Sequence, residues 1–407
     1  MNTVIVIGAG AAGLIACGTA AKTADKVILI ERNDIIGKKL LITGKGRCNI
    51  TNSAEIEDII ASYPHNGKFM YSALYTFTND DIVNLLESMG VKTKVERGGR
   101  IFPVSDKSRD VVNALKKYAL RENTKLVFAK VNKLIIENGK IKGVNTTKGD
   151  YFGDSVIVCT GGKSYPKTGS TGDGYMFAKQ AGHTVVEPKP SLVPIVTAEK
   201  WTAELMGLSL RNISLTAYNS KNKKVFSDFG EMLFTHFGIS GPVVLSMSVH
   251  LKEQEKYRIE IDLKPALNEE QLDDRILRDF EKYNKKHLIN SLDDLLPKAL
   301  IPVIINLSGI EQHRQTGTIT REERMKLAAL LKHLPLTFKG FRPIDEAIVT
   351  SGGVKVSEIN PSTMESKKVS GLYFAGEVID IDGYTGGYNL QAAWSTGYLA
   401  GMNAAEF

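Results

Sequence analysis

Residues 3–31 read TVIVIGAGAAGLIACGTAAKTADKVILIE, and this stretch decides the fold. Residues 3–7 form an apolar, β-branched run that is typical of a strand buried on both faces. A glycine-rich turn follows, then a helix of small residues, and then a second apolar strand that ends in an acid at Glu31. Because this order is that of a dinucleotide-binding βαβ unit, the sequence predicts a Rossmann-like α/β domain.

The glycines of the turn have separate roles in such a unit. Gly8 makes the tight turn, Gly10 lets a pyrophosphate approach the helix N-terminus, and Gly13 permits close helix packing. Glu31 can bind ribose hydroxyls, and its charge argues against a 2′-phosphate at that position. The alternative is a glycine-rich turn of an α/β core that holds no ligand. We predict nucleotide contacts at Gly8, Gly10, Ala11, Ala12, Gly13, Glu31 and Arg32.

The C-terminal end of the chain also contains a strand that leads to a glycine-rich loop. Residues 371–377, GLYFAGE, form a strand that ends in Gly376 and Glu377, and the loop DGYTGGYNLQ at 382–391 leads into a helix. Flavoproteins use such a strand end to hold ribityl hydroxyls and pyrophosphate, with the following loop against the isoalloxazine ring. Both ends of the chain therefore indicate one site for FAD, a ligand long enough to need both.

The stretch TGKGRCNITN, residues 43–52, has neither helical nor strand periodicity, and we predict a loop that holds a ligand. Its two glycines would let the backbone approach a ligand closely, and its two cations would suit phosphate. Its cysteine and asparagine could meet a polar ring edge. The alternative is a surface turn whose polar groups are satisfied within the protein.

Five motifs occur in the order and spacing of one known family. They are GKKLLITGKGRCNITN, CTGGKSYPKTGSTGDGYMFA, LFTHFGISGP, TSGGV and GLYFAGEVIDIDGYTGGYNLQAAWSTG. Over essentially its whole length the chain resembles the YhiN/BaiN-like family of FAD-dependent oxidoreductases, which includes aminoacetone oxidases and enzymes that reduce steroid enones. The resemblance implies a glutathione-reductase-type FAD-binding domain.

The resemblance also implies further cofactor contacts. In the family the GRCN loop lies beside the flavin, and a backbone position in the KVNKL strand meets the adenine. The CTGG turn would return to the cofactor. The implied FAD contacts are Lys39, Gly44, Gly46, Arg47, Cys48, Asn49, Val131, Thr160, Gly161, Gly162, Gly376, Glu377, Gly386, Gly387, Tyr388, Asn389 and Leu390.

The length of the chain indicates more than one domain. At 407 residues it exceeds the roughly 250–300 residues at which a single core stops growing. Prolines in EPKPSLVPIV mark a boundary, after which short strands and then amphipathic helices follow. We predict a discontinuous FAD-binding domain of residues 1–190 and 346–407, an inserted antiparallel β-barrel-like domain of residues 191–265 and 336–345, and a helical subdomain of residues 266–335.

The charge and composition of the chain indicate which kinds of partner and which cellular compartment to expect. The formal charge of +7 suits either a nucleic-acid partner or a basic enzyme with anionic ligands. Basic runs such as KNKK are short, so we read them as solvated surface and do not expect a nucleic-acid partner. Three separated cysteines without a CxxC pair fit a reducing cytoplasm. Glycines interrupt the apolar N-terminal stretch, so we expect it to be part of the folded protein and not a signal peptide. No apolar run reaches the ~20 residues of a membrane helix. The sequence does not determine the oligomeric state.

Catalytic side chains must lie near the flavin, because the cofactor carries the electrons. His236, in FTHFGISGP, could face the flavin, although a hydrogen-bonded histidine at a domain junction is the alternative. Tyr384 could close over the ring or donate to a substrate oxygen. Arg100 could bind a carboxylate or form a structural ion pair. Neither a serine–histidine–aspartate order nor a metal-binding histidine spacing emerges.

The redox partner and the substrate remain alternatives at this stage. Residues 191–345 contain no second G-x-G-x-x-G, so NADH or NADPH would have to dock transiently, and oxygen is another redox partner. We predict an FAD-dependent oxidoreductase whose small or flat organic substrate binds over the flavin, between the TGGYN loop and the inserted domain. An amine oxidase that produces peroxide is an alternative within this class. An FAD-dependent tRNA-modifying protein is an alternative outside it, and a sequence pI of about 9.0 is compatible with it.

Overall fold

The computed structural model describes residues 2–406, and the chain divides into two compact units. One unit comprises Met1–Ser191 and Pro343–Phe407, and the other comprises Leu192–Arg342. Each unit has its own cluster of buried apolar residues. The first unit is therefore discontinuous in sequence.

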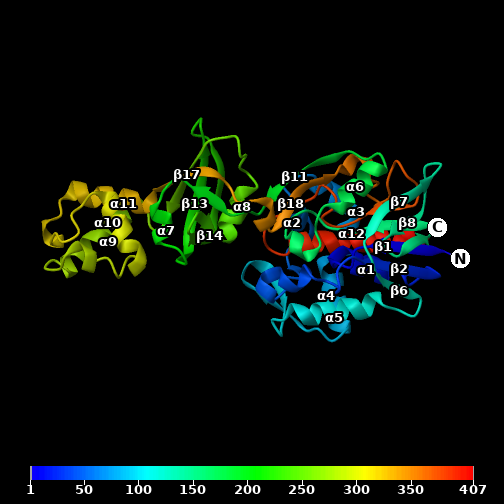
Figure 1. The fold of residues 1–407 in the computed structure, drawn as a ribbon. Helices are drawn as coiled ribbons and strands as arrows, with labels where there is room; N and C mark the ends of the chain where they lie inside the picture. Colours follow the sequence, from blue (N-terminus) through cyan, green and yellow to red (C-terminus); the bar gives the residue numbers. More distant parts are fainter. Residues whose placement is uncertain (1, 407) are drawn as a thin grey trace. The chain divides into compact units, whose positions relative to one another are not determined.

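The first unit contains a parallel sheet in the order β19-β10-β1-β2-β6, of which Figure 1 labels β1, β2 and β6. Strands β1, β10 and β19 are almost entirely buried, which explains their runs of apolar residues. The neighbours of β1 are β2 on one side and β10 on the other, so the strand order reverses there, and α/β sheets bind ligands at the carboxyl ends beside such a point. The strand bounds are β1 Thr3–Ile7, β2 Lys26–Glu31, β6 Thr124–Phe128, β10 Ser155–Val158 and β19 Leu372–Phe374.

Helices α1 (Ala11–Ala20) and α12 (Tyr388–Ala404) pack closely against each other (Figure 1). A Cβ at Gly397 would lie 2.4 Å from the carbonyl oxygen of Ala12, and one at Gly401 would lie 2.4 Å from that of Ala16. Residue numbers rise together along the contact, so the two helices run parallel. Their N-termini therefore point toward the same end of the unit.

Shorter elements complete the first unit. Its other helices are α2 Ile56–Ala61, α3 Tyr71–Thr76, α4 Asn79–Ser88, α5 Ser108–Ala119 and α6 Asp173–Gln180. Small antiparallel sheets are formed by β3 Thr51–Asn52, β5 Arg100–Pro103 and β4 Thr93–Glu96, by β7 Val131–Glu137, β8 Lys140–Thr146 and β9 Gly149–Phe152, and by β11 Val185–Ser191 with β18 Val349–Val354.

An antiparallel closed barrel in the order β12-β15-β14-β13-β16-β17 lies in the second unit. Burial alternates along β17, as it does in a strand with one face toward a core. The fold class expected from the sequence, a Rossmann-like α/β domain interrupted by an antiparallel barrel and helices, is confirmed. The barrel elements are β12 Ile195–Thr197, β13 Ser209–Asn219, β14 Lys224–Thr235, β15 Gly238–Ser240, β16 Tyr257–Asp262 and β17 Leu334–Phe341, with helices α7 Trp201–Glu204 and α8 Pro242–Ser248.

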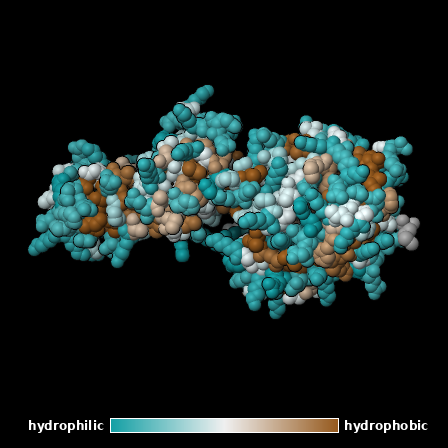
Figure 2. Space-filling view, in the orientation of Figure 1, coloured by the Kyte–Doolittle hydropathy of each residue, from teal (hydrophilic) through white to brown (hydrophobic). Residues whose placement is uncertain are grey.

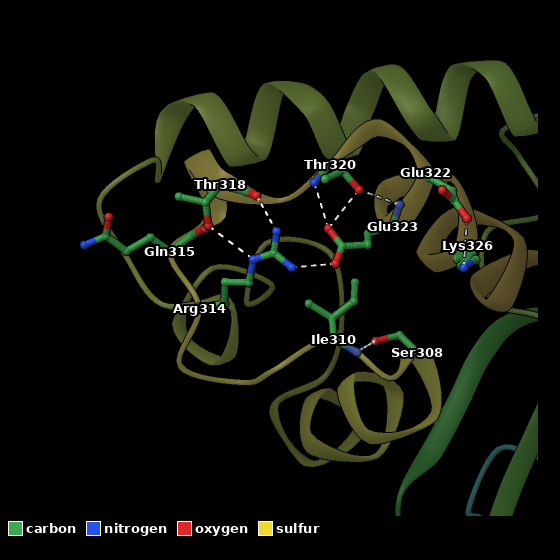
Figure 3. Close-up of polar contacts among 9 residues, drawn as sticks. All are labelled: Ser308, Ile310, Arg314, Gln315, Thr318, Thr320, Glu322, Glu323 and Lys326. Carbon is green, nitrogen blue, oxygen red and sulfur yellow. Dashed lines mark hydrogen bonds and ion pairs between the residues drawn. The ribbon is translucent and has the colours of Figure 1, made fainter.

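A helical part of the second unit contains α9 (Glu269–Lys282), α10 (Ile301–Ser308) and α11 (Arg321–Lys332). Figure 3 shows how the loop before α11 is held. The Arg314 guanidinium donates to the Thr318 carbonyl oxygen and pairs with the Glu323 carboxylate, both at 2.5 Å. The charge of Arg314 is therefore neutralised within this part of the chain.

Side chains on the face seen in Figure 2 are mostly hydrophilic, and the hydrophobic residues lie between them in small groups. Across residues 2–406, we find no helix whose length and apolar character would allow it to span a bilayer.

Candidate functional site

The candidate site lies where the chain leaves the parallel strands of the first unit. A Cβ at Gly8, just past β1, would lie 2.6 Å from the carbonyl oxygen of Cys159, just past β10. A Cβ at Gly13 would lie 1.8 Å from the carbonyl oxygen of Gly8. Packing within the protein therefore requires these two glycines. Gly10 differs, because a Cβ there would meet no atom of residues 2–406 within 4 Å.

Two helix N-termini at this end of the unit have no side-chain cap. Gly10 is the N-cap of α1 and Gly387 is the N-cap of α12, and neither helix carries an acid in its first turn. The first N–H groups of a helix lack intrahelical acceptors, and the helix dipole favours negative charge there. The open space at Gly10 and these free donors fit the pyrophosphate of a dinucleotide. Ala11 and Ala12 lie in the first turn of α1, and Tyr388, Asn389 and Leu390 lie in that of α12.

Glu31 is anchored against the glycine-rich turn at the end of β2. One of its carboxylate oxygens accepts from the N–H of Ala9 at 2.7 Å, and the other accepts from the N–H and the side-chain amide of Asn33, each at 2.8 Å. The oxygen that accepts from Ala9 has a second lone pair, so a ribose hydroxyl can still bind there. The N–H of Ala129 donates to the carbonyl oxygen of Glu31 at 2.9 Å, which brings the chain leading to Val131 beside this strand end.

A polar network joins four segments that are distant in sequence. The Lys39 ammonium lies 2.7 Å from Oε2 of Glu377 and 2.7 Å from Oγ of Ser164. Oε1 of Glu377 accepts from the N–H of Thr350 at 2.9 Å and from the Ser164 hydroxyl at 3.0 Å. Although burial raises the pKa of the Glu377 carboxyl, Lys39 and these hydrogen bonds hold it below its ordinary value. The network leaves Glu377 as a carboxylate next to the fixed positive charge of Lys39.

The loop at residues 43–52 is attached to α12. A Cβ at Gly387 would lie 2.4 Å from the carbonyl oxygen of Thr51, and the Asn49 amide, with its oxygen toward the Gly387 N–H, accepts at 3.0 Å. The indole N–H of Trp394 donates to the carbonyl oxygen of Ile50 at 2.9 Å. The GRCN loop and the TGGYN loop therefore lie side by side. The expectation that all of residues 43–52 is loop is wrong at its end, because Thr51–Asn52 pairs with β5 as strand β3.

The backbone of this loop has several left-handed residues. Gly44, Lys45, Gly46 and Cys48 have φ values of +56°, +58°, +85° and +62°. Such values are uncommon for a residue with a side chain, and strained conformations persist where the surrounding structure holds them. Burial raises the pKa of the Cys48 thiol to about 12, so it stays protonated at neutral pH.

Arg47 and Arg32 are both paired with acids. Arg47 lies between Glu96 and Asp106, 2.7 Å from the latter, and its guanidinium stacks 4.1 Å from the Phe102 ring. Arg32 lies 2.8 Å from the Asp173 carboxylate. A contact of either arginine with FAD stays a prediction, as do contacts at Thr160, Gly161, Gly162, Gly376 and Gly386.

The candidate catalytic residues come from both units. The N–H of Tyr384 donates to the carbonyl oxygen of Ser62 at 3.0 Å, four residues before α12. Arg100 begins β5, opposite Asn52 of β3. His236 is exposed in the second unit, between β14 and β15, where its ring lies edge-on to Phe237 at 4.9 Å. The structure places Tyr384 and Arg100 in the unit of the strand ends, and the role of His236 stays a prediction.

Several polar residues of the site are not among those that sequence reasoning selected. They lie inside or beside the quoted motifs, but no sequence pattern predicts which groups they contact. The only available signal was that their side chains can form hydrogen bonds. These residues are Asn33, Asn52, Ser164, Thr350 and Gln391.

Comparison with known proteins identifies related chains. The family model described as HI0933-like protein Rossmann domain matches residues 2–403. The chain is 36% identical to a ribosomal RNA dihydrouridine synthase of Haemophilus influenzae, over 99% of this chain and 98% of that one. It is 33% identical to a 3-dehydro-bile acid delta(4,6)-reductase of Clostridium scindens, over 100% of both chains. It is 31% identical to a ribosomal RNA dihydrouridine synthase of Escherichia coli, over 98% of this chain and 97% of that one.

Proposed function

The chain belongs to the HI0933-like family of FAD-dependent oxidoreductases, and from this premise we propose that it reduces a uridine of ribosomal RNA to dihydrouridine. The observation that carries the proposal is near-full-length identity of 36% and 31% to two relatives named as ribosomal RNA dihydrouridine synthases. The expectation that nucleic acid is not a partner is unsupported, given these relatives. The formal charge of +7 is favourable for an RNA substrate.

A shared chemistry connects the relatives. Dihydrouridine differs from uridine by two hydrogen atoms across the ring carbon–carbon bond that is conjugated to a carbonyl. The bile acid named for the other relative has a ring carbonyl at position 3 and double bonds at positions 4 and 6. Reduction of a conjugated enone therefore describes both reactions.

The protein's own part in this reaction is to bind, orient and transfer a proton. FAD, when bound, would supply the hydride, and NADH or NADPH, which we propose to dock transiently, would supply the electrons. The free N–H groups of α1 would hold the pyrophosphate, and those of α12 would stabilise negative charge on the flavin ring. Glu31 would hold the adenosine ribose, and Glu377 the ribityl hydroxyls. Oη of Tyr384 would donate a proton to the substrate.

A second candidate substrate is a steroid enone. The near-complete coverage at 33% identity to the bile acid reductase favours it. In this case the small or flat organic substrate expected from the sequence would be the physiological one.

Anaerobic reduction of the bound flavin by NADH or NADPH, followed by mixing with an acceptor, separates these candidates. The acceptors are a ribosomal RNA transcript made in vitro, a 3-oxo-4,6-diene steroid, and air. We expect fast flavin reoxidation by the transcript, and nucleosides two hydrogens heavier than uridine after digestion. Reoxidation by the steroid alone would favour the second candidate. Reduction only by an amine, with fast reoxidation in air and peroxide release, would contradict both and favour an oxidase.

Tyr384→Phe tests the proton transfer to the substrate. We expect it to slow RNA reduction by about 100-fold while flavin reduction by NADPH and FAD content stay unchanged, because general acid catalysis typically contributes that much. Tyr71→Phe is a matched control, since Tyr71 is an exposed residue of α3. Equal rates for Tyr384→Phe and the parent would remove Tyr384 from the mechanism. His236→Ala, measured in the same assay, tests whether the second unit contributes to the reaction.

A further inference from the structure

The hairpin formed by β4 and β5 carries an excess of positive charge close to the candidate site. Residues 92–100 read KTKVERGGR, with four cations and one carboxylate. Arg97 and Arg100 flank the tip, where Gly98 and Gly99 have φ values of +77° and +72° that favour glycine. We call residues 97–100 the RGGR turn. Arg97 is exposed and Arg100 is half-buried.

The two arginines of the RGGR turn are not neutralised. Glu96 lies opposite Arg100 in the hairpin, but it pairs with Arg47 and lies 3.6 Å from the Lys94 ammonium. Nε of Arg100 donates to the carbonyl oxygen of Arg97 at 3.0 Å, and its guanidinium carbon lies 6.0 Å from the centre of the Phe102 ring. Its two terminal nitrogens make no hydrogen bond within residues 2–406. Within residues 2–406, neither Arg97 nor Arg100 has a carboxylate partner. This differs from Arg47, which is paired with two acids on the same hairpin and the loop that follows it.

A single side chain attaches the RGGR turn to the loop before α12. The amide nitrogen of Asn52 donates to the carbonyl oxygens of Gly98 at 2.9 Å and Gly386 at 3.1 Å. The N–H of Ser53 also donates to the carbonyl oxygen of Gly99 at 2.8 Å. The backbone of the RGGR turn, which carries the two arginines, is therefore held beside the glycine-rich loop that leads into the uncapped N-terminus of α12.

We propose that Arg97 and Arg100 bind backbone phosphates of the RNA segment that presents the target uridine. The inference rests on the proposed function, and it adds a binding site for the substrate backbone. A planar guanidinium with two free terminal nitrogens binds phosphate in a bidentate manner, which a surface carboxylate partner would prevent. Rigid attachment through Asn52 would fix the distance from the phosphates to the base that enters the site. NADPH also carries phosphates, so the test must distinguish it from RNA.

The test compares the FAD-loaded parent with a double variant, Arg97→Gln with Arg100→Gln. The matched control is Lys116→Gln with Lys117→Gln, which removes the same charge from exposed positions of α5. A third protein, Arg97→Lys with Arg100→Lys, keeps the charge but not the bidentate geometry. The probe is a ribosomal RNA transcript made in vitro, with binding measured over a range of salt concentrations. Reduction of the transcript, of a 3-oxo-4,6-diene steroid, and of the flavin by NADH and NADPH is measured in parallel.

We expect the arginine-to-glutamine variant to bind the transcript about 10- to 100-fold more weakly, because two charge-assisted contacts are lost. The slope of log K against log salt should fall by about 2, roughly one for each phosphate contact. The lysine-containing variant should recover part of the affinity, and the control variant should match the parent. Flavin reduction by both nicotinamides should be unchanged, because the RNA takes no part in that step.

Four results would overturn the inference in distinguishable ways. If the parent binds and reduces the transcript and the arginine-to-glutamine variant does so equally well, the RGGR turn is not the phosphate site, while the proposed function stands. If the arginine-to-glutamine variant and the lysine-to-glutamine control weaken binding equally, the RNA affinity depends on general surface charge and not on a specific site at the RGGR turn. If the parent neither binds nor reduces the transcript, the proposed function fails and the inference fails with it. A selective loss of flavin reduction by NADPH would assign the arginines to the nicotinamide cofactor.

Discussion

Gly10 and Gly13 allow the cofactor site to be tested with one added methyl group. Gly10 has φ −86° and open space around its Cβ position, so Gly10→Ala should leave the stability of the apoprotein within about 1 kcal/mol of the parent. The methyl group would fill the space that a pyrophosphate needs, so the affinity for FAD should fall by about 10-fold or more. Urea unfolding and titration of apoprotein with FAD measure the two effects.

Gly13→Ala is the control, because its Cβ would overlap the carbonyl oxygen of Gly8 in the protein itself. This variant should be destabilised by about 1–3 kcal/mol before any cofactor is added. Unchanged FAD affinity in Gly10→Ala would show that the pyrophosphate does not approach this glycine.

The contacts of Glu358 lead us to expect that the free energy of unfolding depends on pH. It accepts from the N–H and the hydroxyl of Thr184, each at 2.8 Å, and lies 3.0 Å from the Lys368 ammonium. Although burial raises its pKa, these contacts lower it to about 2. The unfolded-state value is about 4.3, so the stabilisation is fully present above about pH 4.3 and is lost as the pH falls through about 2.

Glu358→Gln should therefore lower the free energy of unfolding by about 2 kcal/mol at pH 7 and by much less near pH 2.5. Chemical unfolding over this pH range checks the expectation. Glu322→Gln is the control, since Glu322 is exposed and forms a surface ion pair with Lys326 at 3.1 Å (Figure 3), and it should change stability little at any pH. An equal loss at both pH values would show that Glu358 acts through packing and not through charge.

At the scale of secondary-structure elements, we predict that the contact between α1 and α12 supports both the fold and FAD binding. Both helices begin at the candidate site, and glycines let them approach closely. Gly401→Val would place side-chain atoms against the backbone of α1, which should destabilise the fold by about 1–3 kcal/mol. Because the N-termini of both helices would shift, the affinity for FAD should fall as well. Thermal unfolding and the FAD content of the purified protein measure these effects.

Met402→Ala is a control on the same helix, because it removes atoms from a half-buried side chain and adds none between the helices. It should retain FAD. If Gly401→Val were destabilised yet bound FAD as tightly as the parent, the helix contact would contribute to the fold but not to the cofactor site.

At the scale of the whole molecule, the two separate hydrophobic cores lead us to predict that the two units unfold separately. We expect two thermal transitions in calorimetry, one for each unit. FAD at about 100 times its dissociation constant should stabilise the first unit by about 2.7 kcal/mol and leave the other transition in place. Leu336→Ala, in the barrel core, should lower only the transition that does not respond to FAD. A single transition that responds to both changes would contradict the separation.

The sequence by itself determined the βαβ unit, the strand that leads to Glu377 and the presence of a barrel and helices in the insertion. Those features depend on local patterns: apolar periodicity, glycines at positions of close approach, and an acid at a strand end. The five motifs also indicated the FAD-dependent family, because their order and spacing are specific.

Only the tertiary structure decided which of these local features meet. Lys39 contacts Glu377 across 338 positions, and Asn49 reaches Gly387, because the order of the parallel strands and the packing of α1 on α12 bring those segments together. Residues 43–52 contain Arg47, and their end, at Asn52, lies opposite Arg100. The Arg47 guanidinium is neutralised by two acids, whereas that of Arg100 is not. Ion pairing depends on the side chains that surround a cation in space, and no local pattern in the sequence determines those neighbours.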